Sequence, residues 1–214
     1  REEPLVNKVK IGILASGRGS NAQAILDAIA AGAINGEVVI IISDNSAAEV
    51  LKRAEANRIP ACCIKRSAFS DKHRFEEALA VELERCGVQL VVLAGFMRLL
   101  SVHFISRFPR KIMNIHPSLL PSFPGLDAQG QAIRYGAKVS GCTVHFVDEG
   151  MDTGPVILQQ AVPVYSEDTA DQLAERILQV EHNLYPRAVD LFCRGRLHCD
   201  GRIVRIDAAK EEES

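Results

Sequence analysis

The stretch Val9-Lys10-Ile11-Gly12-Ile13-Leu14-Ala15-Ser16-Gly17-Arg18-Gly19-Ser20-Asn21-Ala22 joins an apolar run to a glycine loop and then to a helical pattern. The apolar run has the composition of a buried strand. Residues 20–31 then place Ile25, Ala28 and Ile29 at helical spacing, which predicts a helix with one buried face. A strand that leads directly into a helix is the unit from which α/β folds are built.

The same alternation of strand and helix continues along the first half of the chain. Further strands are predicted over residues 38–42, 61–64, 89–94 and 111–115, and helices over residues 47–57, 71–85 and 101–108. Strands that are apolar throughout need cover on both faces, and helical connections suit parallel neighbours. We therefore predict an α/β fold with a doubly wound, mostly parallel sheet and helices on both faces.

The second half of the chain departs from this alternation. Residues 119–136 are rich in proline and glycine, which predicts a long irregular loop of the kind that often carries function. Residues 139–147 and 155–164 predict two long strands with no room for a crossover helix between them. The sheet should therefore end in an antiparallel C-terminal extension.

A final helical pattern follows these strands. Its apolar positions share one face and are Leu173, Ile177, Val180 and Leu184. Asp168 or Thr169 should cap its start, because both side chains can accept from the free N–H groups of a first turn. Pro186 lacks an N–H group and should kink or end the helix.

Length, composition and charge are those of an ordinary globular protein. With 214 residues, 47% hydrophobic and 24% charged, we expect one domain over residues 1–214 with flexible ends at 1–7 and 208–214. The 25 basic and 27 acidic side chains give a net charge of -2, so we expect neither nucleic acid nor a membrane as a partner. Apolar runs of strand length and an N-terminus unlike a signal peptide predict a cytoplasmic location.

The six cysteines form no C-x-x-C pair and have no histidine at metal-ligand spacing. We expect reduced thiols and no metal site. A disulfide between Cys193 and Cys199 is disfavoured in a reducing compartment.

Two polar side chains stand at the end of one predicted strand, in Asn114-Ile115-His116-Pro117. Asn114 and His116 are two residues apart, so both point to the same face, and Pro117 then ends the strand. Open α/β sheets bind ligands at such strand exits. An amide donor beside an imidazole suits a reaction in which a carbonyl oxygen becomes negative, as in acyl transfer. The alternative is that both side chains only satisfy a turn between prolines.

The glycine loop suits a phosphate group, because backbone N–H groups at a helix N-terminus bind anions and the helix dipole adds a favourable field. Ser20 and Asn21 add side-chain donors, and Arg18 adds a charge. The loop also fits the dinucleotide pattern G-x-G-x-x-A, with Asp44 as a candidate ribose ligand. A third interpretation is that the glycines only permit a tight turn, and that Asp44 belongs to a turn and helix cap.

The segment after the fourth strand combines Gly95, which permits a sharp exit, with the apolar Met97, Leu99 and Leu100 and the cationic Arg98. These side chains could form the wall of a binding pocket. Core packing explains the apolar ones equally well.

Taken together, these motifs resemble a known family. The octet from Asn114 to Pro121, the glycine loop and a later Asp152 are similar to the signature of the 10-formyltetrahydrofolate-dependent formyltransferases, over a match from Gly17 to about Leu197. The resemblance implies transfer of the formyl group of 10-formyltetrahydrofolate to the amine of phosphoribosylglycinamide, in de novo purine (IMP) biosynthesis. It also implies no metal, and a monomer or weak homodimer.

The resemblance assigns roles to particular residues. It implies a catalytic set of Asn114, His116 and Asp152. It implies phosphoribosylglycinamide contacts from Gly19, Ser20, Asn21 and Glu181, and folate contacts from Met97, Arg98, Leu99, Leu100, Asn114, Asp148 and Lys72. From the sequence alone, Glu181 would be a solvated helix acid. Gln129 departs from the family, because many relatives carry a histidine there and an amide cannot titrate near neutral pH.

Three alternatives remain. Other formyltransferases or formyl-folate hydrolases of the same superfamily share these motifs, but we expect them to carry added domains. A nicotinamide-dependent oxidoreductase would use Gly17 to Ala22 and Asp44, and would leave Asn114 and His116 without a role. A non-catalytic folate-binding homologue should lack one of the three catalytic residues, and all three are present.

Overall fold

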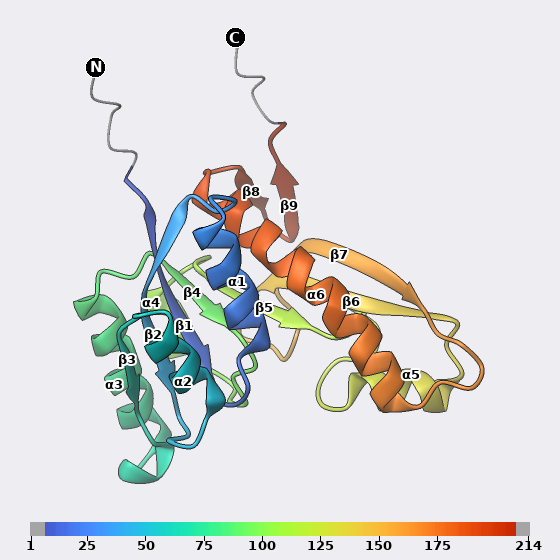
Figure 1. The fold of residues 1–214 in the computed structure, drawn as a ribbon, viewed down its shortest axis with the longest axis horizontal. Coiled ribbons are helices and arrows are strands. Elements are labelled where there is room, and N and C mark those ends of the chain that lie inside the picture. Colours follow the sequence, from blue (N-terminus) through green and yellow to red (C-terminus); the bar gives the residue numbers. More distant parts are fainter. Residues whose placement is uncertain (1–6, 209–214) are drawn as a thin grey trace. The chain divides into compact units, whose positions relative to one another are not determined.

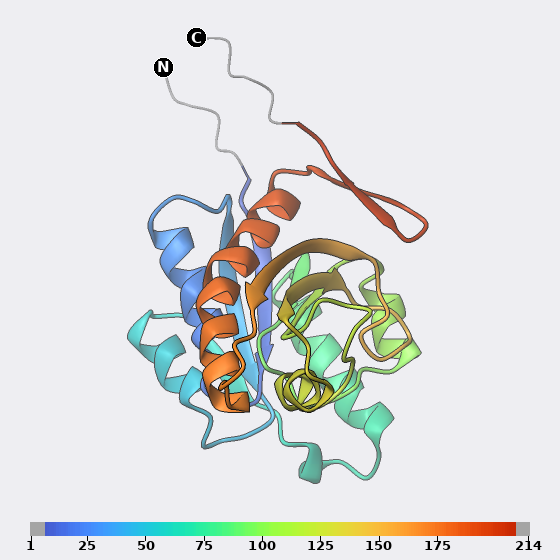
Figure 2. The same ribbon diagram turned by 90° about the vertical axis from the view of Figure 1, so that its right-hand side faces the viewer.

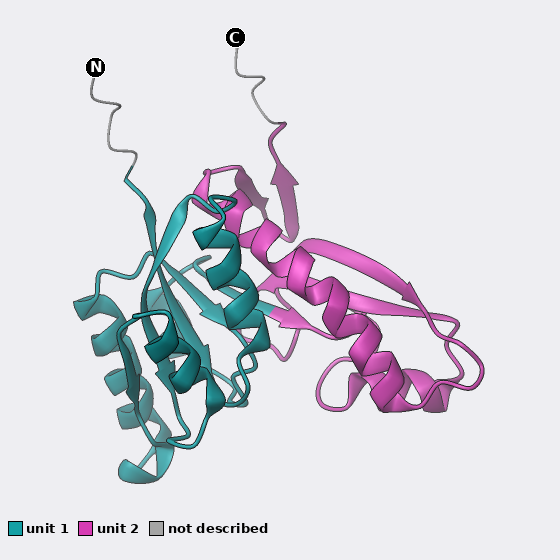
Figure 3. Ribbon diagram, viewed as in Figure 1, with its two compact units in different colours: residues 1–114 teal, residues 115–214 magenta. Residues whose placement is uncertain are grey.

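The structure is a computed structural model that describes residues 7–208. The chain divides into two compact units, residues 1–114 and 115–214 (Figure 3). The predicted single domain over 1–214 remains a prediction. The predicted flexible ends lie almost wholly outside the described residues.

Strand pairing follows the predicted topology. A seven-stranded sheet has the order β3-β2-β1-β4-β5-β6-β7, and a separate two-stranded sheet pairs β8 with β9. The strands of the first unit are β1 (Val9–Ala15), β2 (Gly36–Ser43), β3 (Ala61–Cys63), β4 (Leu90–Leu93) and the start of β5 (Ile112–His116). All pairings among these strands are parallel, which confirms the doubly wound prediction.

Helices cover both faces of the first unit's strands, as Figures 1 and 2 show for α1 and α2 on one side and α3 and α4 on the other. These helices are α1 (Ser20–Ala30), α2 (Glu49–Ala56), α3 (Lys72–Arg85) and α4 (Val102–Arg107), with a 3-10 turn η1 (Arg66–Ala68) before α3. Such cover is required because Ile11, Ile13, Val91 and Val92 are fully buried.

The second unit holds the antiparallel part of the sheet. Its elements are α5 (Ala128–Tyr135), β6 (Val139–Phe146), β7 (Val156–Pro163), α6 (Ala170–Cys193), β8 (Leu197–Asp200) and β9 (Ile203–Ile206). The antiparallel pairing of β6 with β7 confirms the predicted extension. Helix α6 packs against both strands (Figure 1) and buries Leu173, Ile177 and Leu184.

Helix α5 was not predicted, because the residues from 119 to 136 indicated an irregular loop throughout. The Asp127 side chain accepts from Gly130 N and caps the helix, and Gly136 ends it in the left-handed conformation. Gly130 lowers helix propensity, but a Cβ atom there would lie 2.2 Å from the Asp127 carboxylate. Gly130 therefore makes the helix hard to predict from propensity, and it also leaves the space in which the Asp127 cap forms.

The ends of α6 resolve two open predictions. Thr169 is the N-cap and forms a capping box with Gln172, whereas Asp168 pairs with Arg176 at 2.7 Å. Pro186 does not end the helix, which continues to Cys193. Tyr185, Ala188 and Val189 are all fully buried around it, and this packing offsets the missing backbone hydrogen bond.

The hairpin of β8 and β9 also went unpredicted. Leu197 and Cys199 alternate with polar residues in β8, but four residues are the shortest run that indicates a strand, and β9 does not alternate. Gly201 occupies its tip with φ of 58°. Within residues 7–208, no helix is long and apolar enough to cross a membrane.

Candidate active site

A histidine and an aspartate from distant parts of the sequence meet in the second unit. His116 ends β5, and its Nδ1 lies 3.3 Å from Asp152 Oδ2. Its Nε2 donates to the Phe123 carbonyl at 2.8 Å. Both ring nitrogens therefore face acceptors, an arrangement that suits an imidazolium with its two N–H donors. The ring is 5% exposed, so water contributes little to these contacts.

Asp152 lies in the connection between β6 and β7, where its backbone adopts φ of 55°. The Gly125 N–H donates to its Oδ2 at 2.8 Å. The adjoining chain packs closely, because a Cβ atom on Gly154 would lie 1.6 Å from the Phe146 carbonyl. Asp148 orders the start of this connection by accepting from Gly150 N at 3.1 Å and Thr153 Oγ1 at 2.6 Å.

A second histidine lies next to this pair and was missed by the sequence analysis. His145 on β6 is buried, and its Nε2 lies 3.9 Å from Asp152 Oδ1. Burial lowers the pKa of His145, partly opposed by its Nδ1 donation to the Phe146 carbonyl at 2.9 Å and by the Asp152 charge. The aspartate therefore faces a histidine that favours the neutral form. The one sequence signal for His145 is the alternation of side chains along its strand, which sets the face of the sheet on which its ring lies.

The segment that follows His116 is anchored by a buried hydroxyl. Thr143 Oγ1 donates to the Ser118 carbonyl at 2.7 Å and accepts from Leu120 N at 3.0 Å. The Gln159 side chain donates to the same oxygen at 3.0 Å and to the Leu120 carbonyl at 2.9 Å. These contacts fix the backbone that follows strand β5.

Replacing Thr143 with valine should therefore destabilise the protein by about 2–4 kcal/mol, because each buried polar group left unsatisfied costs about 1–3 kcal/mol. Urea titration of the wild type and Thr143→Val would measure the change. Thr143→Ser keeps the hydroxyl and should remain within about 1 kcal/mol of wild type. A Thr143→Val variant as stable as Thr143→Ser would show that the hydroxyl contacts contribute little to stability.

The backbone carbonyls of the glycine loop are hydrogen-bonded to α2 and to the turn before it. The carbonyls of Ser16, Gly17 and Arg18 accept from Asn45, Val50 and Arg53 respectively. Each peptide N–H points opposite to the carbonyl of the same peptide group, so the following N–H groups point away from these partners. Gly19 is required here, with φ of 69° and a Cβ position 2.4 Å from Val50. Ser20 then starts α1.

The predicted folate segment is tied to the end of β1. The Met97 N–H donates to Ser16 Oγ at 3.0 Å, and Ser16 N donates to the Gly95 carbonyl at 3.0 Å. Met97 is 72% exposed and Leu99 58% exposed, whereas Leu100 is 9% exposed. Core packing thus accounts for Leu100 but not for the other two, which form an apolar surface.

The two basic residues predicted to contact the folate, Arg98 and Lys72, both pair with carboxylates of the first unit. Arg98 Nε donates to the Asp44 carboxylate, and its guanidinium lies 5.6 Å from the centre of the Phe75 ring. Asp44 is therefore neither a helix cap nor an open ribose ligand, which weakens the nicotinamide alternative. Lys72 Nζ lies 3.6 Å from the buried Glu76 carboxylate.

Glu181 differs from the solvated acid that the sequence alone suggested. It lies on α6 and is only 6% exposed. Burial, with a smaller contribution from the Glu181 charge, raises the pKa of the Cys142 thiol to about 12.

Asn114 stands in β5 opposite Leu93 and two residues before His116. The structure thus brings His116, Asp152 and the Asp148 connection together in one unit, while the glycine loop and Met97 to Leu100 lie in the other.

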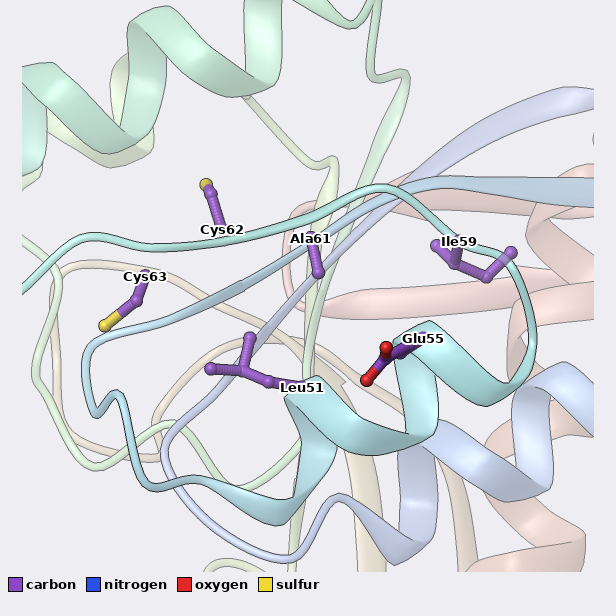
Figure 4. Close-up of a pocket in the computed structure, with 6 residues that line it drawn as sticks. All are labelled: Leu51, Glu55, Ile59, Ala61, Cys62 and Cys63. Atoms are coloured by element: carbon purple, nitrogen blue, oxygen red, sulfur yellow. The ribbon is translucent and has the colours of Figure 1, made fainter.

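A separate cavity of about 380 Å³ lies in the first unit between helix α2 and strand β3 (Figure 4). Its lining residues are Leu51, Glu55, Ile59, Ala61, Cys62 and Cys63. None of the predicted site residues lines it. Burial raises the pKa of Cys62 to about 11, so this thiol is a poor nucleophile near neutral pH.

All six cysteines are free in the structure. Among the residues that the structure describes, no three histidine, cysteine or acidic side chains gather as a metal site would require.

A doubly wound sheet with a His–Asp pair and an amide donor at one strand exit defines a class of α/β enzymes suited to group transfer. Within that class, the chain belongs to the formyl transferase family, whose sequence model matches residues 9–189.

Three relatives illustrate the relationship. The phosphoribosylglycinamide formyltransferase of Bacillus subtilis (strain 168) is 43% identical over 84% of this chain and 92% of its own length. The trifunctional purine biosynthetic protein adenosine-3 of Homo sapiens is 41% identical over 96% of this chain, which spans 20% of that longer protein. The crystal structure of glycinamide ribonucleotide transformylase 1 from Symbiobacterium toebii matches with a TM-score of 0.92 and 51% identity, over 93% of this chain and 94% of that one.

Proposed function

We propose that this enzyme transfers the formyl group of 10-formyltetrahydrofolate to the primary amine of phosphoribosylglycinamide, a step of purine biosynthesis. The observation that carries the proposal is the His116–Asp152 pair at the exit of β5, with Asn114 on the same strand. The named activities of the relatives select the acceptor. We further propose that it works in the cytoplasm as a monomer or weak homodimer, on small molecules alone.

The chemistry follows from the donors at this strand exit. The amine nitrogen attacks the formyl carbon, and the carbonyl oxygen becomes an oxyanion. The Asn114 amide and the protonated His116 ring donate hydrogen bonds to that oxyanion. Asp152 stabilises the imidazolium and accepts the proton that the amine loses. When the tetrahedral intermediate collapses, the bond from the formyl carbon to the folate nitrogen breaks, and that nitrogen gains the proton that Asp152 took from the amine.

The hydrogen bond from His116 to Phe123 sets a condition on this mechanism. Nδ1 faces Asp152, so Nε2 is the ring nitrogen that can reach the oxyanion. In the structure Nε2 donates to the Phe123 carbonyl at 2.8 Å. That carbonyl occupies the acceptor position that the oxyanion would take. The Phe123 segment must therefore release the ring before the reaction.

The remaining assignments concern binding. Gly19, Ser20 and Asn21 would hold the substrate phosphate, because all three stand where the glycine loop enters α1, and N–H groups at a helix start bind anions. The buried Glu181 carboxylate would accept from the ribose hydroxyls. The folate would contact Met97, Arg98, Leu99, Leu100 and Asp148. Lys72 remains a predicted folate contact, although its ammonium lies 3.6 Å from Glu76.

Replacing Ser20 and Asn21 together with alanine should raise the KM for phosphoribosylglycinamide more than that for the folate. The physical reason is that both side chains stand at the start of α1, where the loop offers its donors. Steady-state kinetics with each substrate varied in turn would measure the two constants. A rise confined to the folate constant would exchange the two ligand assignments.

One experiment tests the proposed function directly. Labelled formyl from 10-formyltetrahydrofolate is followed into phosphoribosylglycinamide, into charged initiator tRNA, and into free formate without any acceptor. The proposal expects rapid labelling of phosphoribosylglycinamide alone. Preferential labelling of the tRNA, or formate release at the same rate without acceptor, would favour another formyltransferase or a formyl-folate hydrolase.

A further inference from the structure

The connection that carries Asp152 has little apolar packing to hold its shape. Met151 is 49% exposed, and Thr153 is also exposed on the other side of the aspartate. Asp152 itself adopts a left-handed backbone conformation, with φ of 55°. Such a conformation is uncommon in a non-glycine residue, and surrounding contacts help to hold it. Polar contacts to this connection therefore decide where the Asp152 carboxylate lies.

Asp148 supplies such contacts from inside the connection, through Gly150 N and Thr153 Oγ1. A second contact comes from outside it. Arg202 Nη2 donates to the Thr153 carbonyl at 2.8 Å. Thr153 directly follows Asp152, so the guanidinium restrains the Thr153–Gly154 peptide, one residue beyond Asp152. Hydrogen bonds from charged donors are stronger than those between neutral groups.

Arg202 is presented by the tip of the β8–β9 hairpin. Asp200 pairs with Ile203, which leaves Gly201 and Arg202 as a two-residue turn. Gly201 has φ of 58°, and a glycine with positive φ at the first turn position is typical of tight hairpins. The turn geometry thus directs Arg202, while the neighbouring Arg205 pairs with Asp200 of its own hairpin at 3.3 Å.

We propose that Arg202 is a positioning residue for the reaction, and that the hairpin of residues 197–206 braces the connection that holds Asp152. The inference rests on the proposed function for its kinetic consequence. Its structural part, restraint of residues 150–154 by Arg202, stands independently of which substrate is used. The hairpin thereby gains a role that its short exposed strands do not suggest.

The test compares Arg202→Ala with Arg205→Ala, a matched loss of an exposed hairpin arginine. Arg202→Ala should lower kcat by roughly three- to ten-fold, equivalent to one lost hydrogen bond of modest strength, and should change each KM by less than about two-fold. Arg205→Ala should stay within about two-fold of wild type in every constant. Arg202→Lys, which retains a charged donor, should recover most of the lost turnover.

Amide hydrogen exchange provides a readout that needs no activity. Exchange at residues 150–154 should be faster in Arg202→Ala than in wild type or Arg205→Ala, with thermal unfolding unchanged. Equal exchange in the two alanine variants would overturn the brace. Faster exchange with unchanged kcat, or a loss expressed in KM instead, would overturn the positioning role. A wild-type enzyme that formylates no phosphoribosylglycinamide would refute the proposed function, while the exchange result would still decide the brace.

Discussion

His116→Ala is expected to lower turnover by roughly 10²-fold or more, the range that a general acid or base typically contributes. Folate binding should remain largely intact, because the ring's described partners are Asp152 and the Phe123 carbonyl and not the apolar surface of Met97 and Leu99. Single-turnover kinetics would measure the chemical step, and equilibrium titration with a non-reactive folate would measure affinity.

His103→Ala is the matched control for this prediction. His103 also faces a carboxylate, Glu77, at 3.7 Å, but it lies on the exposed surface of α4. Its loss should leave turnover near wild type. Equal losses of folate affinity and rate in His116→Ala would make His116 a structural histidine and would end its assignment to the reaction.

The first unit could be predicted from sequence because local and tertiary signals agree there. Residues 11–15 are apolar and buried on both faces of the strand, and β1 (Val9–Ala15) has the bounds of the predicted strand. Helix α3 begins one residue after Asp71, whose side chain caps it by accepting from Arg74 N at 2.8 Å. In both cases the side chains that are buried, or that cap the element, lie in the element or directly before it in the sequence.

The second unit resisted prediction where an element depends on contacts remote in the sequence. Helix α5 contains Gly130, whose benefit to the Asp127 cap cannot be seen from propensity. Pro186 predicted a kink or an end in α6, and buried packing carries the helix on to Cys193. Strands β8 and β9 have four residues each and bury no side chain fully, so their periodic signal is weak.

The site shows the same division. Asn114 and His116 share a strand, so their common face follows from alternation alone. Asp152 became a candidate only through the family resemblance, because no local pattern connects it to His116. The pairing of Arg98 with Asp44, the proximity of His145 and the contact of Arg202 with Thr153 all join segments far apart in the chain. The sequence pattern does not show which side chains from distant segments point toward one another after folding.

Asp152→Asn is expected to fold normally and to lose most of its turnover, again by roughly 10²-fold. Asparagine keeps the shape of the side chain, accepts a hydrogen bond and tolerates the left-handed backbone. The contact with the Gly125 N–H, 2.8 Å in the structure, can therefore survive the change. What disappears is the charge opposite His116 and the capacity to take the amine's proton. Steady-state kinetics and urea titration would separate loss of rate from loss of stability.

Asp127→Asn distinguishes this catalytic account from the alternative that Asp152 only caps a turn. Asp127 also has a left-handed backbone, with φ of 54°, and it also accepts a backbone N–H, from Gly130 at 3.2 Å. Asparagine is about as good a cap as aspartate, so turnover of Asp127→Asn should remain near wild type. If Asp152→Asn behaves in the same way as Asp127→Asn, the charge at position 152 has no chemical role. The proton would then need another acceptor, and Asp152 would have to be withdrawn from the proposed catalytic set.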